Sequence, residues 1–171
     1  MLIAMMMLGL GFQGPIEVEM KGVLQTVKDG PSTRAVLKIN DDETLVLASR
    51  RKDLEEELKN ASGATVVIEG HRAKALLPPG VDLIVEDYRI LDVGDGQVPR
   101  LGQLAVFDAP EGQRLLFVDE TGRADLLPES WNKRMMNEVG ARLWILGRRD
   151  GRTFVPVRFR ILRARAERGS E

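Results

Sequence analysis

The sequence contains no cysteine, a single histidine and few aromatic residues. Without cysteine, the chain can supply no disulfide, no thiolate nucleophile and no thiolate ligand for iron–sulfur clusters. A catalytic triad or a histidine metal site would have to be built on His71 alone. No phosphate-binding loop of the GxxxxGK type is present. We therefore expect no enzymatic activity, no bound metal and no cofactor.

The sequence also has no apolar run of the roughly 20 residues that a membrane-spanning helix needs. The apolar segment at residues 1–14 is shorter, and its length suits the apolar core of a signal peptide. However, no Lys or Arg precedes Lys21, and no Ala-x-Ala cleavage site follows. An apolar arm that packs on the folded chain is the alternative, so cleavage, export to a compartment such as the periplasm and retention in the cytoplasm all stay open.

The clearest positive signal is an internal repeat. The segment Gly63–Arg72 reappears as Gly140–Arg149, with Gly, Ala, Ile, Gly and Arg at the same places. A second match relates Tyr88–Leu91 to Phe159–Leu162, and the stretch between the two matches is shorter in the second copy. The chain of 171 residues is long enough for two small domains. We therefore predict two copies of one folding unit.

Each copy shows the order strand, strand, strand, helix, strand, strand. The helices are short, and their apolar residues line one face. A glycine follows each helix, where a left-handed residue ends it. The last strand of the second copy alternates, which predicts Val157 on the same face as the apolar Val155. The helix-face residues are Leu54, Leu58 and Ala61 in the first copy and Trp131, Met135 and Val139 in the second, followed by Gly63 and Gly140.

This element order, together with the Gly-x-x-φ-φ-φ-x-Gly rhythm of the fourth strand, resembles the OB-fold. The predicted fold is therefore mainly β, with two tandem five-stranded OB-like barrels, each with one short helix between strands three and four. The resemblance implies a binding surface on strands two and three and on the loops between strands one–two and four–five. It implies no particular ligand. The predicted parts are an apolar segment at 1–14, a first barrel at 15–92, a linker at 93–100, a second barrel at 101–163 and a charged tail at 164–171.

The two halves differ in charge. Residues 16–95 carry a net charge of −5, and residues 100–171 carry +4. Much of the positive charge is arginine around the predicted turn Asp150-Gly151 and along the last strand, and arginine pairs well with carboxylates and phosphates. The candidate binding residues are Arg148, Arg149, Arg152, Arg158, Arg160 and Phe117.

These observations predict a non-enzymatic module that binds a protein or a small ligand. The alternative is single-stranded nucleic-acid binding through the arginine-rich second barrel. That alternative needs aromatic side chains that stack on bases, and Phe117 is the sole aromatic residue in the second and third strands of either copy. The acidic and basic halves could also dock on each other, within one chain or between chains, and the sequence does not define the oligomeric state.

Overall fold

The structure is a computed structural model that describes residues 16–73, 80–94 and 96–165. The predicted apolar segment at 1–14 and most of the predicted tail at 164–171 lie outside the described residues. In the first half, the elements are β1 (Glu17–Asp29), β2 (Ser32–Lys38), β3 (Thr44–Ala48), α1 (Lys52–Asn60), β4 (Thr65–Arg72) and β5 (Leu83–Asp92). In the second half, they are β6 (Arg100–Ala109), β7 (Gly112–Asp119), β8 (Ala124–Leu126), α2 (Glu129–Met135), the 3-10 turn η1 (Met136–Glu138), β9 (Arg142–Asp150) and β10 (Thr153–Arg163).

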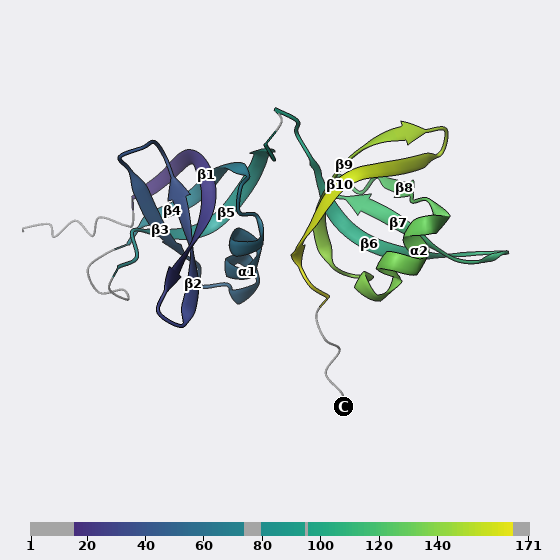
Figure 1. Ribbon diagram of the computed structural model, residues 1–171, viewed down its shortest axis with the longest axis horizontal. Helices are drawn as coiled ribbons and strands as arrows, with labels where there is room; N and C mark the ends of the chain where they lie inside the picture. Colours follow the sequence, from purple (N-terminus) through teal and green to yellow (C-terminus); the bar gives the residue numbers. More distant parts are fainter. Residues whose placement is uncertain (1–15, 74–79, 95, 166–171) are drawn as a thin grey trace, which may run out of the picture.

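Each half forms a closed five-stranded barrel with the same strand order. The first barrel closes in the order β1-β2-β3-β5-β4, and the second in the order β6-β7-β8-β10-β9. In each barrel the third and last strands are parallel and the other neighbours are antiparallel. Figure 1 shows the barrels side by side, with a helix on each. The predicted fold class is confirmed as mainly β, with two closed five-stranded sheets and one short helix between strands three and four of each.

The strand registers place the two sequence matches at equivalent positions. Ile68 pairs with Tyr88 in the first barrel, and Ile145 pairs with Phe159 in the second. The fourth strands need glycine because the next strand passes so close. A Cβ on Gly70 would lie 2.1 Å from a backbone oxygen of β5, and one on Gly147 would lie 2.3 Å from a backbone oxygen of β10.

The helices bury the predicted apolar faces. In the first barrel, Leu54, Leu58 and Ala61 are all buried. In the second, Trp131 and Met135 are buried, but the α-helix ends at Met135 and η1 follows, so Val139 reaches the core from beyond the helix. Gly63 and Gly140 have φ values of +91° and +92°, as expected for left-handed residues that end these segments.

The predicted alternation along β10 is wrong at Val157. Pro156 pairs with Gly147, but Arg158 pairs with Leu146, so Val157 is an extra residue with no partner on β9. Its side chain is 79% exposed. Proline has no N–H to donate to the ladder, and strands accommodate it at bulges of this kind. Before the bulge, Phe154 faces the core of the second barrel, and after it Phe159 and Ile161 face that core. Leu162, on the opposite face of β10, then lies in the core of the first barrel.

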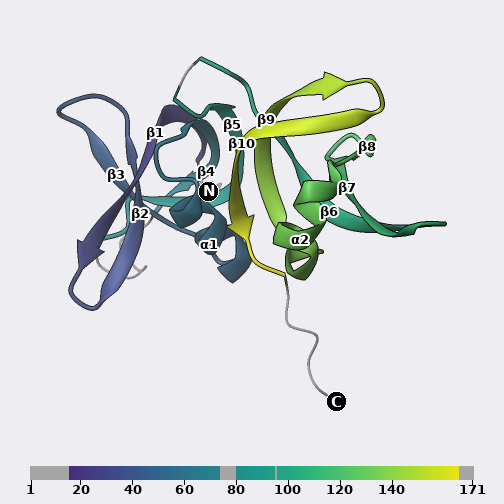
Figure 2. The same cartoon turned by 45° about the vertical axis from the view of Figure 1, so that its right-hand side comes forward.

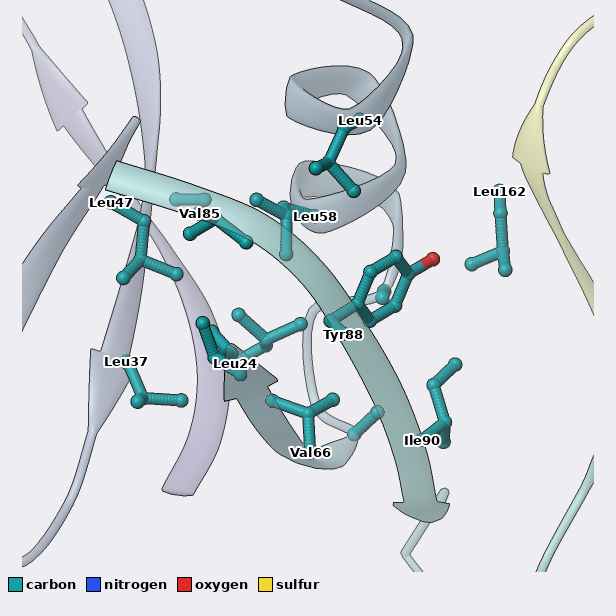
Figure 3. Packing of buried hydrophobic residues seen from close by; sticks show 14 of the residues in the cluster. Leu24, Leu37, Leu47, Leu54, Leu58, Val66, Val85, Tyr88, Ile90 and Leu162 are labelled. Atoms are coloured by element: carbon teal, nitrogen blue, oxygen red, sulfur yellow. The ribbon is translucent and has the colours of Figure 1, made fainter. Parts of the chain in front are cut away.

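Two side chains of the second barrel belong to the core of the first. Trp144 on β9 and Leu162 on β10 are buried in the cluster that also holds Tyr88 and Ile90, and Leu101 and Leu146 pack against the same cluster. Figure 3 shows Leu162 approaching this cluster from a separate strand. In both ribbon views β10 runs beside α1 (Figures 1 and 2). The two barrels therefore share an apolar interface.

Candidate functional site

A buried ionic network reinforces the contact between the barrels. Glu57 on α1 is fully buried, and its Oε2 accepts hydrogen bonds from the Tyr88 hydroxyl at 3.1 Å and from Arg142 Nη1 on β9 at 2.8 Å. Arg142 also pairs with Glu120. Arg163 on β10 pairs with Asp53 at 2.6 Å and lies 3.5 Å from Glu57 Oε1. Acidic groups of the first barrel are thus matched by arginines of the second.

The network shifts the pKa values of its members. Burial raises the pKa of Tyr88, and the negative charge of Glu57 raises it further. Burial alone would lower the pKa of Arg142, but the charges of Glu57, Tyr88 and Glu120 and the hydrogen bond to Glu120 together outweigh burial, and the net pKa is raised. Both shifts favour a protonated Tyr88 and a charged Arg142 around the Glu57 carboxylate.

Two of the predicted binding arginines also hold the barrels together. Arg160 Nη1 donates to the backbone oxygens of Asn60 at 3.2 Å and Ser62 at 2.5 Å, just after α1. Arg158 donates to the backbone oxygen of Val93, and its guanidinium lies 5.6 Å from the centre of the Trp144 ring. These contacts answer the docking question that the charge asymmetry raises: the acidic and basic halves dock within one chain.

Phe117 and Arg149 belong to a second ionic cluster, inside the second barrel. Phe117 is fully buried, so it is a core residue and its predicted role on a binding surface is wrong. The Arg100 guanidinium lies 5.2 Å from the ring centre of Phe117 and pairs with Asp125 at 2.5 Å and with Asp119 at 2.6 Å. Arg149 also pairs with Asp125, whose side chain is 3% exposed.

This arginine–aspartate cluster lowers the pKa of both carboxyl groups. Burial alone would raise the pKa of Asp125, but hydrogen bonds from Arg100 and Arg149 outweigh it and the net pKa is lowered. The pKa of Asp119 is lowered by hydrogen bonds from Thr121 and Arg100. The cluster is therefore ionised, and Arg149 is committed to it rather than presented to a ligand.

The last two predicted arginines, Arg148 and Arg152, are exposed and flank the turn between β9 and β10. Within the described residues, no hydrogen bond or ion pair to either side chain is present. They lie on a projecting arm, which we define as residues 147–156 of β9, β10 and their turn. Figures 1 and 2 show this arm extending away from the first barrel. Of the six predicted residues, the structure leaves these two available to a partner.

Sequence reasoning missed a second property of the arm, its open edge. In the first barrel, β4 pairs with β1 from Thr65 to His71. In the second, β9 pairs with β6 only from Arg142 to Ile145. On that side of β9, no strand in the described part of the chain pairs with residues 147–150, all of which are exposed. The signal was present in the sequence: Pro99 stands just before β6 and cannot donate to a ladder.

A hollow in the second barrel offers no further free charged group. Its volume is about 390 Å³, and its charged lining residues are Asp119, Glu120, Arg142 and Arg163. Each of these four side chains is already paired within the chain. The described residues hold no group of three or more His, Asp or Glu side chains placed to bind a metal. None of the helices in the described ranges is long and apolar enough to cross a membrane.

No protein-family model matches the chain, and no curated protein matches it. Among solved structures, the chain is similar to the crystal structure of the tetrameric p202 HIN2, with 12% sequence identity over 84% of this chain and 92% of that chain. The TM-score is 0.28. A likeness of this size carries no argument about function.

Proposed function

We propose that the chain is a non-enzymatic binding module of two OB-fold barrels held as one unit, and that it binds a partner protein through the arm of the second barrel. The strand order of each half and its single helix after the third strand support the OB-fold assignment. The arm is built from the hairpin between strands four and five, which OB-folds use for binding. The observation that carries the proposal is the β9 edge beside Arg148 and Arg152: within residues 16–73, 80–94 and 96–165, neither the edge nor these two side chains have a partner.

The shared interface supports the view of one unit. Trp144 and Leu162 complete the core of the first barrel, and Glu57 is fully buried between Tyr88 and Arg142. Separating the barrels would leave that carboxylate without its arginine partners, which is costly for a buried charge. The first barrel therefore acts as a base that fixes the position of the second, and the arm projects from that base.

A protein partner fits the arm better than a single-stranded nucleic acid. Single-strand binders combine a basic groove with aromatic side chains that stack on bases. Among the large hydrophobic side chains that are exposed in the described ranges, Phe107 is the one aromatic, and it is 50% exposed. The four candidates Arg149, Arg158, Arg160 and Phe117 are committed to contacts within the chain. Nucleic-acid binding through Arg148 and Arg152 is the alternative that the test must address.

The test compares the chain with an Arg148→Glu/Arg152→Glu variant as bait in a lysate of the source cells. We expect a small set of proteins to be retained by the chain and lost from the variant, measured by quantitative mass spectrometry. Arg72→Glu is the matched control, because Arg72 is an exposed arginine at the end of β4 and should leave capture unchanged.

A labelled oligothymidylate covers the alternative. We expect no change in its anisotropy at low salt. Binding that is lost in the double variant and falls by about 0.7 log units per log of salt for each phosphate contacted would replace the proposal with nucleic-acid binding.

A further inference from the structure

The open edge of β9 marks the place of a strand segment that the first barrel has and the second lacks. Met20 pairs with Ile68 on β4, and Arg100 pairs with Ile145 at the equivalent place on β9. Counting back from these residues, Gln97–Pro99 correspond to Glu17–Glu19. Glu17–Glu19 pair with β4, but Gln97–Pro99 form no strand.

The local sequence explains the missing segment. Pro99 stands in the place of Glu19, is buried, and has no N–H for a ladder hydrogen bond. Gly94 and Gly96, with φ values of +114° and +67°, turn the chain between the barrels. Val98, which corresponds to Val18, is 72% exposed. The linker therefore cannot fill the position beside residues 147–150 of β9.

An exposed strand edge is a template for another extended chain, because it presents unpaired backbone N–H and C=O groups. The structure limits the length of such a chain. The exposed part of the edge covers residues 147–150, since Leu146 already packs against the first barrel. β1 pairs with the equivalents of Gly147 and Arg148, so a segment of about four residues would repeat that pairing at these two residues and extend beside Arg149 and Asp150.

The first barrel shows the chemistry that suits this position. Glu17 lies opposite His71, and His71 is the residue that Arg148 replaces in the second barrel. Val18 lies opposite Gly70, the equivalent of Gly147, and packs against the core. The segment that fills the edge in the first barrel thus reads acidic, apolar, acidic. His71 pairs with Glu86 in the first barrel, whereas Arg148 has no partner among the described residues, so an acidic residue placed opposite Arg148 would gain a charge-assisted hydrogen bond.

We propose that the second barrel binds an extended acidic segment of a partner protein, added as a strand antiparallel to β9 along residues 147–150. A carboxylate of that segment pairs with Arg148, and Arg152 at the tip of the arm adds a second positive charge. The inference rests on the proposed function, because it names the surface and the chemical class of the partner that the arm recognises.

The probe is a peptide that copies Ile16–Glu19 of this chain, with blocked ends, because the positions that follow are filled by β6 in the second barrel. On titration into the full chain, we expect the backbone amides of Gly147–Asp150 to shift in NMR spectra and to gain protection from hydrogen exchange. Arg148→Glu should weaken peptide binding by about tenfold or more, because a charge-assisted hydrogen bond is lost. The matched control Arg72→Glu should leave the affinity unchanged.

Two N-methylated peptides separate strand addition from simple charge pairing. An added strand uses alternate amides to bond its neighbour, so methylation of one alternate set should abolish binding and methylation of the other should not. Equal binding by both peptides, or no new protection at residues 147–150, would overturn the inference.

The tests of the inference and of the proposed function can fail separately. If arm-dependent proteins are captured but neither the peptide nor their acidic segments protect the β9 edge, strand addition is wrong and the proposed function stands. If the double variant captures the same proteins as the chain and the peptide does not bind, both fail. Oligothymidylate that protects the same amides, with no effect of the peptide, also overturns the inference in favour of nucleic acid.

Discussion

The two barrels fill the same three inward-facing places with opposite chemistry. Strand pairing defines these places. The first residue pairs with Ile68 or Ile145 on strand four, the second lies at the end of strand two, and the third lies on strand three. At the second place, each backbone N–H closes the same turn, at 3.0 Å in both barrels. The first barrel has Met20, Ile39 and Leu45 there, and the second has Arg100, Asp119 and Asp125.

The difference gives the second barrel an ion cluster where the first barrel has apolar side chains. A buried ion cluster is weak evidence of added stability, because desolvation offsets most of its Coulomb energy. The cluster does, however, bind Arg149, which lies within the arm, near its turn. In the first barrel, β4 is held instead by its pairing with Glu17–Val23 of β1. The ionic cluster thus anchors the arm where the missing strand segment cannot.

Removing one charge from this ionic cluster should lower the free energy of unfolding more than any other change considered below. We expect Asp125→Leu, which copies Leu45, to destabilise the chain by about 3 kcal/mol, because Arg100 and Arg149 lose their shared buried carboxylate and only Arg100 keeps a second one, Asp119. The triple variant Arg100→Met/Asp119→Ile/Asp125→Leu copies the whole apolar set and should recover most of that loss. Urea unfolding followed by circular dichroism measures both. If the triple variant is no more stable than the single one, the three places are not equivalent.

Truncating a side chain in the contact between the barrels should cause the next largest loss of stability. Leu162 is fully buried in the core of the first barrel although it belongs to the second. We expect Leu162→Ala to cost about 2–5 kcal/mol, as for other buried leucines, and to lower the melting temperature of both barrels. Val157→Ala, on the same strand but exposed, should change stability by less than about 0.5 kcal/mol. Calorimetry would contradict the shared core if only the second barrel melted earlier.

The sequence predicted the fold because the fold depends on local rules. The repeated glycines mark close strand approaches and helix ends, and the apolar spacing of Leu54 and Leu58 marks a helix face. These signals act over a few residues, so they can be identified without knowing the packing. The exception is Val157, where a proline-induced bulge breaks an alternation that looked regular.

The candidate site was predicted only in part, for a physical reason. Clustered arginines indicate positive charge, but the sequence does not say which carboxylate each one meets. Groups distant along the chain form hydrogen bonds or ion pairs with Arg158, Arg160 and Arg149. In the described part of the chain, no such partner is present for Arg148 or Arg152. The open edge depends on a comparison of registers between two barrels, and only a structure supplies registers.

Lowering the pH should reduce the stability of the second barrel more than that of the first. The pKa values of Asp119 and Asp125 are lowered in the folded chain, so their contribution to stability is present above their ordinary values near 4 and is lost as the pH falls below them. Each unit of lowering corresponds to about 1.4 kcal/mol. We expect the triple apolar variant to lose less stability than the parent between about pH 5 and pH 2. Parallel pH curves would show that the cluster does not couple to protonation.

Alkali should affect the contact between the barrels through Tyr88, which is the only tyrosine in the chain. Its pKa is raised from the ordinary 10.0, so the folded state keeps the phenol proton when the unfolded state has lost it. The contribution of Tyr88 is therefore complete below about pH 10 and is lost as the pH rises above it. Tyrosinate absorbance should stay low in the folded chain and appear only on unfolding.

Tyr88→Phe should lower the free energy of unfolding by about 1.5 kcal/mol at neutral pH, because the hydrogen bond to Glu57 is lost while Arg142 still donates to that carboxylate oxygen. The Tyr88→Phe variant should also lose less stability than the parent as the pH rises above about 10. A tyrosinate signal near pH 10 in the folded chain would contradict the burial of the Tyr88 hydroxyl against Glu57.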